Sequence, residues 1–508
     1  VDSIQIVEIK HNIEKDLGVI ISEVDLLEDI TLNNLSKKIL QNIHEEILIS
    51  QMGKLKKVSS VDDEHPLSYN QKTMWYLQEL SPNNSAYNIS FALTFKSSIN
   101  INRFKDSMQR LLERHSILRT IYHQREDRPV QKILKYYDFR VETLKCANWS
   151  ERQLKEEVNR IAQLPFDIKK DIPIRVFLLE KNNKETVALF TFHHIAVDLW
   201  SITLIMNELE ELYLTDFNEK SSGQNSNLYN YVDYVYWQKE MLENSNEEKS
   251  ISYWAKKLGG DLPVLELPTD YLRPNIQTYN GNNFSFEINP NVTEKLKKLA
   301  KLNGTTLNNI LMAAYKVWLH RYTGQDDLLV GIPSAGRGLQ QLNNVVGYFV
   351  NPLVVRTDFS GNPTFIEVLN RVKRNMLDAI THQDYPFPLL VEKLKVRRDN
   401  SRHPIFQTMF VMQALHKKRE LSDFILGENK QQEKYLNIPV ESFPVETNAS
   451  QLDLTLKMVE TPKGLRALFE YNTDLFKQST IEKMSKHLIN ILENVAIKPD
   501  EKIGNYSL

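Results

Sequence analysis

The sequence has little of what marks a secreted, membrane-spanning or nucleic-acid-binding protein. Its 508 residues include one cysteine, Cys146, which excludes an intramolecular disulfide framework and a cysteine-rich metal site. Within these residues we recognise no signal-peptide pattern and no apolar run long enough to cross a bilayer. The formal net charge is only −2, so charge gives no reason to expect binding to nucleic acid or to an acidic membrane. We expect a cytoplasmic protein without a metal ion.

What is present is the composition of a globular protein, with 41% hydrophobic and 25% charged residues. A chain of 508 residues is too long for one ordinary core and predicts about three domains or subdomains. The basic runs at 54–57 and 395–398 are short, which favours surface or linker positions. The chain starts abruptly at Val1, inside a motif, so we expect it to be a piece of a longer protein.

The most informative stretch is a buried strand that ends in two histidines. Thr186–Phe192 is apolar or β-branched without a break, which predicts a strand buried on both faces. Successive strand side chains point to opposite faces, so His193 and His194 should diverge, one toward a cavity and one beneath the sheet. Asp198 follows, before an amphipathic helix. The apolar positions of that helix are Ile202, Ile205, Leu209 and Leu212. Two histidines and a nearby aspartate at such a position favour a functional site.

Residues 1–50 have a helical pattern. A helix follows Asp2 and Ser3 and ends near Gly18, and a second covers about 32–47. On geometry alone, Asp2 and Ser3 are interpreted as a helix N-cap pair. Residues 51–64 are polar and are interpreted as a linker.

From residue 65 the pattern is mixed α/β. We expect strands at 89–95, 117–123, 174–180 and 186–192, with helices at 102–115 and 151–162. The second half repeats this order, with strands at 284–288 and 327–332 and helices at 291–302 and 305–322. The repetition predicts two similar subdomains, 65–240 and 241–508.

Seven short motifs follow one another along residues 67–404. They are LSYNQKTMW (67–75), RHSILRT (114–120), HHIAVD (193–198), YVDYVYW (231–237), VGYFVNPL (346–353), HQDYPF (382–387) and RDNSRHP (398–404). Each alone is a weak signal. In this order, they make residues 66–508 resemble the condensation domain of nonribosomal peptide synthetases.

The resemblance implies an α/β (α+β) fold of two chloramphenicol-acetyltransferase-like subdomains in a V, with a tunnel between them and carrier proteins docking at its two ends. The implied catalytic set is His194, His193 and Asp198. Within it His194 faces the tunnel and does the chemistry, His193 packs behind it, and Asp198 anchors the loop in an ion pair with Arg337. Leu199 stands where the family usually has glycine, so we expect it to reshape the acceptor channel.

Residues 1–50 resemble the later helices of acyl and peptidyl carrier proteins. This implies that Ser3 carries a covalent 4′-phosphopantetheine arm, attached by a phosphopantetheinyl transferase. The implied partners are this upstream donor carrier, a downstream acceptor carrier and the neighbouring synthetase modules. The sequence around Ser3, V-D-S-I, is closer to polyketide-type carriers and favours a hybrid polyketide/peptide synthetase.

The implied reaction forms an amide bond between a carrier-bound acyl or peptidyl thioester and the amine of a carrier-bound aminoacyl group. An α-amine has a pKa of about 7.7–8.0, so roughly a tenth is neutral at pH 7 and strong activation before attack is unnecessary. His194 would orient the amine and accept its proton after attack. The alternative is a catalytically silent docking domain that recruits a partner enzyme to a carrier. Motifs specific to epimerisation domains, heterocyclisation domains and CoA-dependent acyltransferases are missing.

Overall fold

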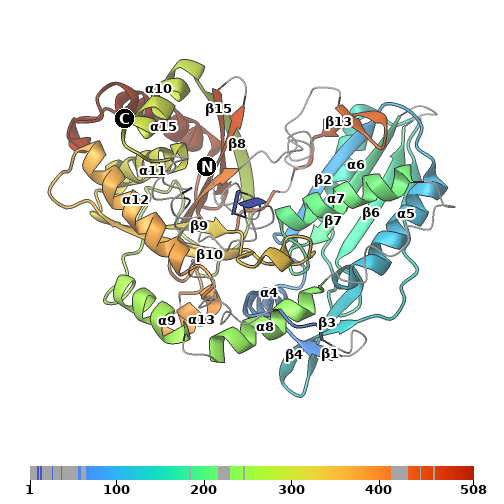
Figure 1. Ribbon diagram of the computed structural model, residues 1–508. Helices are drawn as coiled ribbons and strands as arrows, with labels where there is room; N and C mark the ends of the chain where they lie inside the picture. Colours follow the sequence, from blue (N-terminus) through green and yellow to red (C-terminus); the bar gives the residue numbers. More distant parts are fainter. Residues whose placement is uncertain are drawn as a thin grey trace.

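The computed structural model describes residues 9–10, 12–13, 26, 36, 55–58, 64–181, 185–215, 229–243, 246–396, 399–413, 433–446, 448–461 and 464–508. These residues form two lobes, each built around a six-stranded sheet (Figure 1). The two helices expected in 1–50, and Ser3 itself, lie outside the described residues, apart from single positions in those helices.

The sheet of the N-terminal lobe has the order β12-β13-β2-β7-β6-β5. Its central strand β7 (Thr186–His193) is buried at all eight positions, which confirms the predicted doubly buried strand. One face packs against α5 (Ile101–Arg114) and α7 (Leu199–Leu214), and the other against α6 (Glu151–Ala162). The remaining early strands are β2 (Asn88–Phe95), β5 (Glu142–Lys145) and β6 (Ile174–Glu180).

The sheet of the C-terminal lobe has the order β10-β9-β11-β14-β15-β8. Its strands are β8 (Gly281–Ile288), β9 (Asp327–Ser334), β10 (Asn351–Asp358), β11 (Thr408–Gln413), β14 (Leu454–Thr461) and β15 (Gly464–Asn472). Four helices pack against one face of the sheet in a single apolar core. They are α10 (Pro290–Leu302), α11 (Leu307–Thr323), α12 (Phe365–Thr381) and α15 (Gln478–Ile497). The opposite face is turned toward the N-terminal lobe (Figure 1).

A hairpin from late in the chain completes the early sheet. Strands β12 (Glu433–Tyr435) and β13 (Ile438–Phe443) join the N-terminal sheet, where β13 pairs antiparallel with β2. The hydroxyl of Tyr435 donates to the Met206 carbonyl at 2.7 Å. The subdomain boundary at 240/241 stays a prediction, but the N-terminal sheet also contains residues from far beyond it.

Smaller elements join the lobes at their base. They are the three-stranded sheet β1 (Glu64–Pro66), β4 (Arg128–Ile133) and β3 (Thr120–Arg125), and the helices α4 (Tyr69–Leu80), α8 (Tyr231–Glu243), α9 (Asn246–Lys257) and α13 (Phe387–Lys393). The strand expected at 117–123 was partly wrong, because Ser116–Arg119 is a 3-10 turn and the strand begins at Thr120. The Arg119 guanidinium holds this turn through the carbonyls of Leu112, Glu113 and Leu134.

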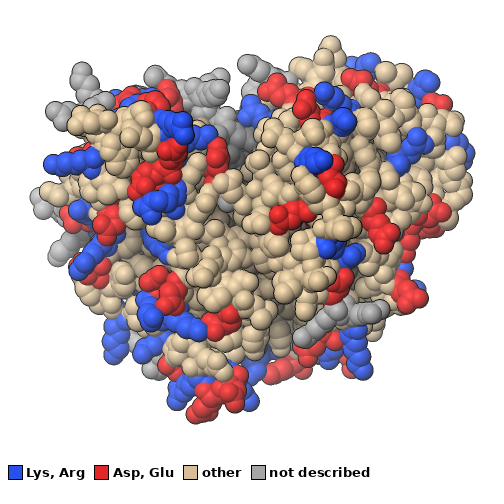
Figure 2. Space-filling model, turned by 180° about the vertical axis from the view of Figure 1, so that it is seen from behind, with Lys and Arg blue, Asp and Glu red and all other residues tan. Residues whose placement is uncertain are grey.

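The face of the molecule drawn in Figure 2 carries both charges without a dominant sign. Figure 2 shows lysine and arginine interspersed with aspartate and glutamate over one face, in keeping with the small net charge. Cys146 is buried in the small core between α6 and the N-terminal sheet, and burial raises the pKa of its thiol. None of the helices in the described ranges combines the length and apolarity needed to cross a membrane.

Candidate active site

The two histidines lie where β7 ends and the chain turns toward α7. The backbone N–H of His193 donates to the Pro173 carbonyl at 3.0 Å, and that of His194 to the Tyr87 carbonyl at 2.9 Å. A tight turn follows, in which the Ala196 N–H donates to the His193 carbonyl at 3.1 Å. The two imidazoles have separate surroundings, His193 against Phe166 and His194 against Tyr348, as the divergence predicted from strand alternation requires.

His193 is a buried, neutral imidazole. Its Nδ1 accepts the N–H of Ile195 at 3.1 Å, so the ring proton is on Nε2, which donates to Gln78 Oε1 at 3.3 Å. The ring packs edge-on against Phe166. Burial lowers the pKa of His193 to about 3. Both nitrogens are occupied and the side chain is 1% exposed, so this residue has a structural environment.

His194 has the arrangement that a general base requires. Its Nδ1 lies 2.7 Å from the Val197 carbonyl oxygen, and because a carbonyl only accepts, Nδ1 carries the proton. Nε2 then has an unshared electron pair and no hydrogen-bond partner among the described residues. Burial lowers the pKa of His194, against the opposite effects of the Val197 carbonyl and Asp198. The imidazole is therefore neutral near pH 7 and can accept a proton.

Asp198 is both the N-cap of α7 and the partner of an arginine from the other lobe. Its Oδ1 accepts the N–H of Ser201 at 2.8 Å, and its Oδ2 accepts the N–H of Phe349 at 3.1 Å. Arg337 Nη2 lies 3.4 Å from Asp198 Oδ1. The structure thus brings together the residues expected to form the ion pair, and the capping interaction coexists with it.

Arg337 is fully buried and donates hydrogen bonds to several acceptors. Its Nη1 donates to the carbonyls of Leu342 and Val345, and its Nη2 donates to Ser201 Oγ at 2.8 Å. The guanidinium also lies 4.1 Å from the centre of the Phe349 ring. These contacts fix the C-terminal-lobe segment that follows β9 against the first turn of α7.

The weaker sequence motifs converge on the same loop. Tyr231 OH lies 2.9 Å from Ser68 Oγ and donates to the Tyr348 carbonyl at 2.6 Å. Gln71 Nε2 donates to the Ile195 carbonyl, two residues after His193, at 3.0 Å. The residues of 67–75, 231–237 and 346–353 therefore form the packing around the histidine loop. Sequence reasoning identified the motifs, but not these partners or Gln78.

Leu199 and Ser3 are not placed at this site by the structure. Leu199 is the first residue of α7, half-buried, and it packs against the N-terminal core. It is not among the residues that line the cavity beside His194. Its effect on an acceptor channel remains a prediction, as does the role of Ser3, which lies outside the described residues.

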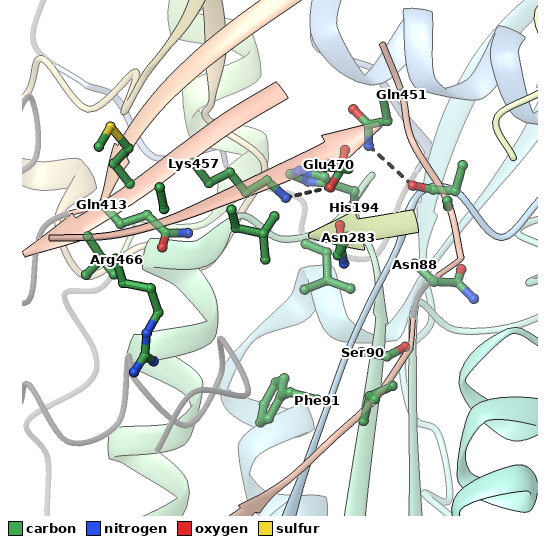
Figure 3. A pocket seen from close by; sticks show the side chains of 18 of the residues that line it. Asn88, Ser90, Phe91, His194, Asn283, Gln413, Gln451, Lys457, Arg466 and Glu470 are labelled. Carbon is green, nitrogen blue, oxygen red and sulfur yellow. Dashed lines mark hydrogen bonds and ion pairs between the residues drawn. The ribbon is translucent and has the colours of Figure 1, made fainter. Parts of the chain in front are cut away.

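His194 lines a cavity of about 300 Å³ between the two sheets (Figure 3). Residues of β2 form one wall, and residues of β8, β11, β14 and β15 form the other. Gln451 spans the gap, because its Nε2 donates to the Ala86 carbonyl at 3.3 Å. The cavity wall contains the ion pair Lys457–Glu470, which sequence reasoning missed, although strand alternation could have indicated it.

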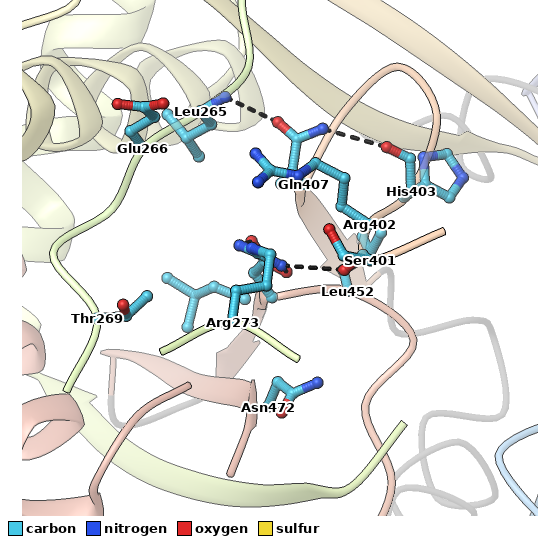
Figure 4. A network of polar contacts seen from close by, with 12 residues as sticks. Leu265, Glu266, Thr269, Arg273, Ser401, Arg402, His403, Gln407, Leu452 and Asn472 are labelled. Carbon is cyan, nitrogen blue, oxygen red and sulfur yellow. Dashed lines mark hydrogen bonds and ion pairs between the residues drawn. The ribbon is translucent and has the colours of Figure 1, made fainter. Parts of the chain in front are cut away.

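A polar network fixes the segment that connects α9 to β8 (Figure 4). Arg273 makes a bidentate pair with Asp453, with Nη1 2.8 Å from Oδ1. Gln407 Oε1 accepts the N–H of Leu265 at 2.8 Å. These bonds tie the connecting segment to β14 and to the start of β11. Within the described ranges, no group of three or more His, Cys, Asp or Glu side chains could hold a metal ion.

Comparison with known families gives two matches that together cover most of the chain. The family model of the condensation domain matches residues 61–508, and that of the phosphopantetheine attachment site matches residues 1–39. The range 1–39 includes Ser3.

Among curated proteins, the chain is 37% identical over 489 residues to one of the linear gramicidin synthase subunits from Brevibacillus parabrevis, covering 94% of this chain and 9% of that protein. It is 33% identical over 501 residues to surfactin synthase subunit 1 of Bacillus subtilis (strain 168), covering 98% and 13%. The chain therefore spans only a small part of the length of these relatives.

Solved structures share the fold. The X-domain from teicoplanin biosynthesis is 24% identical with a TM-score of 0.80, covering 90% of this chain and 100% of that one. A four-domain nonribosomal peptide synthetase bound to AMP and glycine is 25% identical with a TM-score of 0.78, covering 89% and 34%. The first condensation domain of the calcium-dependent antibiotic synthetase is 16% identical with a TM-score of 0.72, covering 88% and 100%.

Proposed function

The chain belongs to the family of nonribosomal peptide synthetase condensation domains, preceded by part of a carrier domain with a phosphopantetheine attachment site, and from this membership we propose that it forms an amide bond between two carrier-bound substrates. The donor is an acyl or peptidyl thioester and the acceptor is the amine of an aminoacyl thioester. The observation that carries the proposal is His194, whose Nε2 is unprotonated and whose side chain lines the cavity between the lobes.

In the reaction, the acceptor nitrogen attacks the donor carbonyl, a C–N bond forms and the C–S bond breaks, releasing the donor thiol. The attacking amine becomes cationic as the tetrahedral intermediate forms and must lose a proton. Neutral His194 accepts it on Nε2, while Nδ1 stays bonded to the Val197 carbonyl. The proton then passes to the departing sulfur, so the donor arm leaves as a thiol and His194 is neutral again. Holding both substrates in one cavity contributes as well, because it replaces a bimolecular encounter.

The other site residues act through position. His193, Asp198 and Arg337 are buried and bonded within the protein, so they hold the loop and do not touch substrate. Ser3 carries the phosphopantetheine arm, which a phosphopantetheinyl transferase attaches, and the thiol of this arm then bears the acyl group. The partners are a donor and an acceptor carrier within neighbouring synthetase modules, in the cytoplasm.

The test measures amide formation between a donor on a complete upstream carrier and an acceptor on a downstream carrier. His194→Ala should lower the rate about 10²–10⁴-fold, the usual contribution of a general base. His487→Ala is the matched control, since His487 contacts Tyr322 in the helical layer of the C-terminal lobe and should leave the rate unchanged. A His194→Ala rate within a few-fold of wild type contradicts the proposal.

The second candidate function is a silent domain that recruits a partner enzyme to a carrier. It is suggested by the likeness in fold to the teicoplanin X-domain, which has also been solved in complex with OxyB. The open Nε2 of His194 favours catalysis, because a recruiting surface does not require a base in the cavity. The same assay separates the two, since a silent domain forms no amide with any donor or acceptor.

A further inference from the structure

The sheet of the C-terminal lobe has one apolar face and one face with charged residues. Along β14, Leu456 and Met458 belong to the core beneath the helices, so Lys457 between them points the other way. Along β15, Ala467 and Phe469 face the core, so Glu470 also points away from it. Both charged side chains line the cavity that contains His194.

Lys457 and Glu470 form a close pair inside this cavity. Lys457 Nζ lies 2.6 Å from Glu470 Oε2 (Figure 3). The side chain of Lys457 is 35% exposed and that of Glu470 is 15% exposed. The pair also faces the same space as the reacting centre, because His194, Lys457 and Glu470 line one cavity. A substrate group that enters the cavity beside His194 therefore meets a cation and an anion side by side.

Neutral hydrogen-bonding groups extend this polar wall. Asn283 lies opposite Glu470 in the pairing of β8 with β15 and lines the same cavity. Gln413 at the end of β11 and Ser90 on β2 line it as well. The wall formed by the C-terminal sheet thus offers donors and acceptors at several points, whereas apolar side chains such as Phe91 and Phe443 line the side of the N-terminal sheet.

We propose that Lys457 and Glu470 recognise a peptide group of a peptidyl substrate, so that this domain condenses peptidyl rather than fatty-acyl chains. The proposal rests on the proposed amide-forming function and names its substrate class. An ammonium that donates beside a carboxylate that accepts is complementary to a carbonyl and an N–H of one peptide chain. An alkyl chain in the same place would remove the remaining water from the ion pair and return no hydrogen bond.

Another part of the substrate could make the same hydrogen bonds, because a phosphopantetheine arm also contains amide groups. Substitution of Lys457 or Glu470 distinguishes the arm from the peptidyl chain. A contact with the arm affects every donor equally, since the arm is common to all of them. A contact with the peptidyl chain affects peptidyl donors only.

The experiment uses the whole chain, with one donor carrier loaded either with a tripeptidyl or with an octanoyl group and one fixed aminoacyl acceptor. Wild type should give a higher kcat/KM with the tripeptidyl donor. Lys457→Met and Glu470→Gln should each lower that value about tenfold, for the loss of one charge-assisted hydrogen bond, and leave octanoyl transfer within about threefold. Lys297→Met is the matched control, because Lys297 pairs at 2.7 Å with Glu460 of the same strand β14 but lies on α10 in the helical layer.

Three outcomes overturn the inference. They are an octanoyl preference in wild type, equal losses for both donors in the variants, and no loss for either donor. Unchanged melting temperatures of the variants show that the losses are not due to unfolding. Failure of the proposed function itself would look different, since wild type would then form no amide from either donor.

Discussion

At the scale of single residues, adjacent histidines acquire different chemistry from their immediate surroundings. His193 has a backbone N–H directed at Nδ1 and an amide oxygen near Nε2, and it is fully enclosed. His194 has a carbonyl at Nδ1, which places the proton there and leaves Nε2 with an unshared electron pair. The tautomer of each imidazole is thus set by the backbone group that lies at its Nδ1.

Burial of neutral His193 makes the stability of the fold sensitive to acid. Its pKa is about 3 in the folded chain and about 6.5 when unfolded, so below pH 6.5 the unfolded state binds the proton first and stability falls until pH 3. Between pH 7 and pH 5 the titration of this residue should lower the free energy of unfolding by about 2 kcal/mol. The free energy of unfolding, measured in urea at both pH values, should fall by about 2 kcal/mol less in His193→Asn than in wild type.

The control for this prediction is His487→Asn, which replaces a half-buried histidine on α15. Between the two pH values, the free energy of unfolding of this variant should fall by as much as that of wild type. An equally large loss in His193→Asn would mean that His193 is not the residue that titrates.

Sequence reasoning succeeded at this scale where a regular element set the direction of a side chain. Strand alternation alone predicted that His193 and His194 diverge. It could not predict the Val197 carbonyl as the partner of His194, because that contact depends on the irregular turn between β7 and α7. Gln78 and Ser201 were missed for the same reason, since long-range contacts fix them.

At the scale of elements, the segment between β9 and β10 packs around a glycine. A Cβ at Gly347 would lie 2.0 Å from Tyr231 Cδ2 and 2.8 Å from Phe349 Cε2. The backbone N–H of Gly347 donates to Ser201 Oγ at 3.0 Å, and that hydroxyl donates to the Gly347 carbonyl at 2.7 Å. The close approach of this segment to α7 brings the Phe349 N–H and the Arg337 guanidinium to the Asp198 carboxylate.

Gly347→Ala should therefore move this segment away from α7. We expect a loss of about 1–3 kcal/mol in the free energy of unfolding, from overpacking against a ring that cannot move away freely. Amide formation should fall as well, because the loop that holds His194 loses its support. Both are measured on one preparation, by urea unfolding and by the carrier assay.

Gly338→Ala provides the comparison. The nearest atoms to a Cβ there belong to the Asp384 carboxylate, the closest at 3.3 Å, so the substitution should lower the free energy of unfolding by less than about 1 kcal/mol. Equal losses in the two variants would show that the close approach at Gly347 has no special role.

Elements with a clear apolar period were predicted well. The helix at 151–162 and the strand at 174–180 have the predicted bounds, and the four apolar positions chosen for α7 are all buried. The start of β3 was wrong, because a 3-10 turn and an alternating strand share a short apolar pattern. The hairpin β12–β13 was missed, since its strands are short and pair with a segment far away in the sequence.

At the scale of the whole molecule, the lobes are joined at several separate places. The Asp198–Arg337 pair joins the loop after His194 to the C-terminal lobe, Gln451 bridges to Ala86, and the hairpin extends the N-terminal sheet. The cavity that His194 lines has walls from both lobes, so no single lobe contains the whole site.

A substitution in the hairpin should consequently destabilise the other half of the chain. Val440 is fully buried and lies opposite Phe95 on β2. Val440→Asp should cost about 3 kcal/mol or more, because it buries an unpaired carboxylate. Hydrogen exchange should accelerate first in β2, although that strand is encoded near the start of the chain.

Glu441→Gln is the control, since it removes only a partly exposed ion pair with Lys96 and should cost less than about 1 kcal/mol. Faster exchange confined to β14 and β15 in Val440→Asp would contradict the assignment of the hairpin to the N-terminal sheet.

The pairing of β13 with β2 also has a consequence for biosynthesis. Strand β2 leaves the ribosome about 350 residues before its partner, which corresponds to about 20–70 s at 5–20 residues per second. During that interval the hydrogen-bonding edge of β2 is exposed and can pair with another nascent chain. Neighbouring ribosomes on one messenger would present the same uncovered edge, so translation speed and chaperone access should govern the yield of this domain more than its final stability.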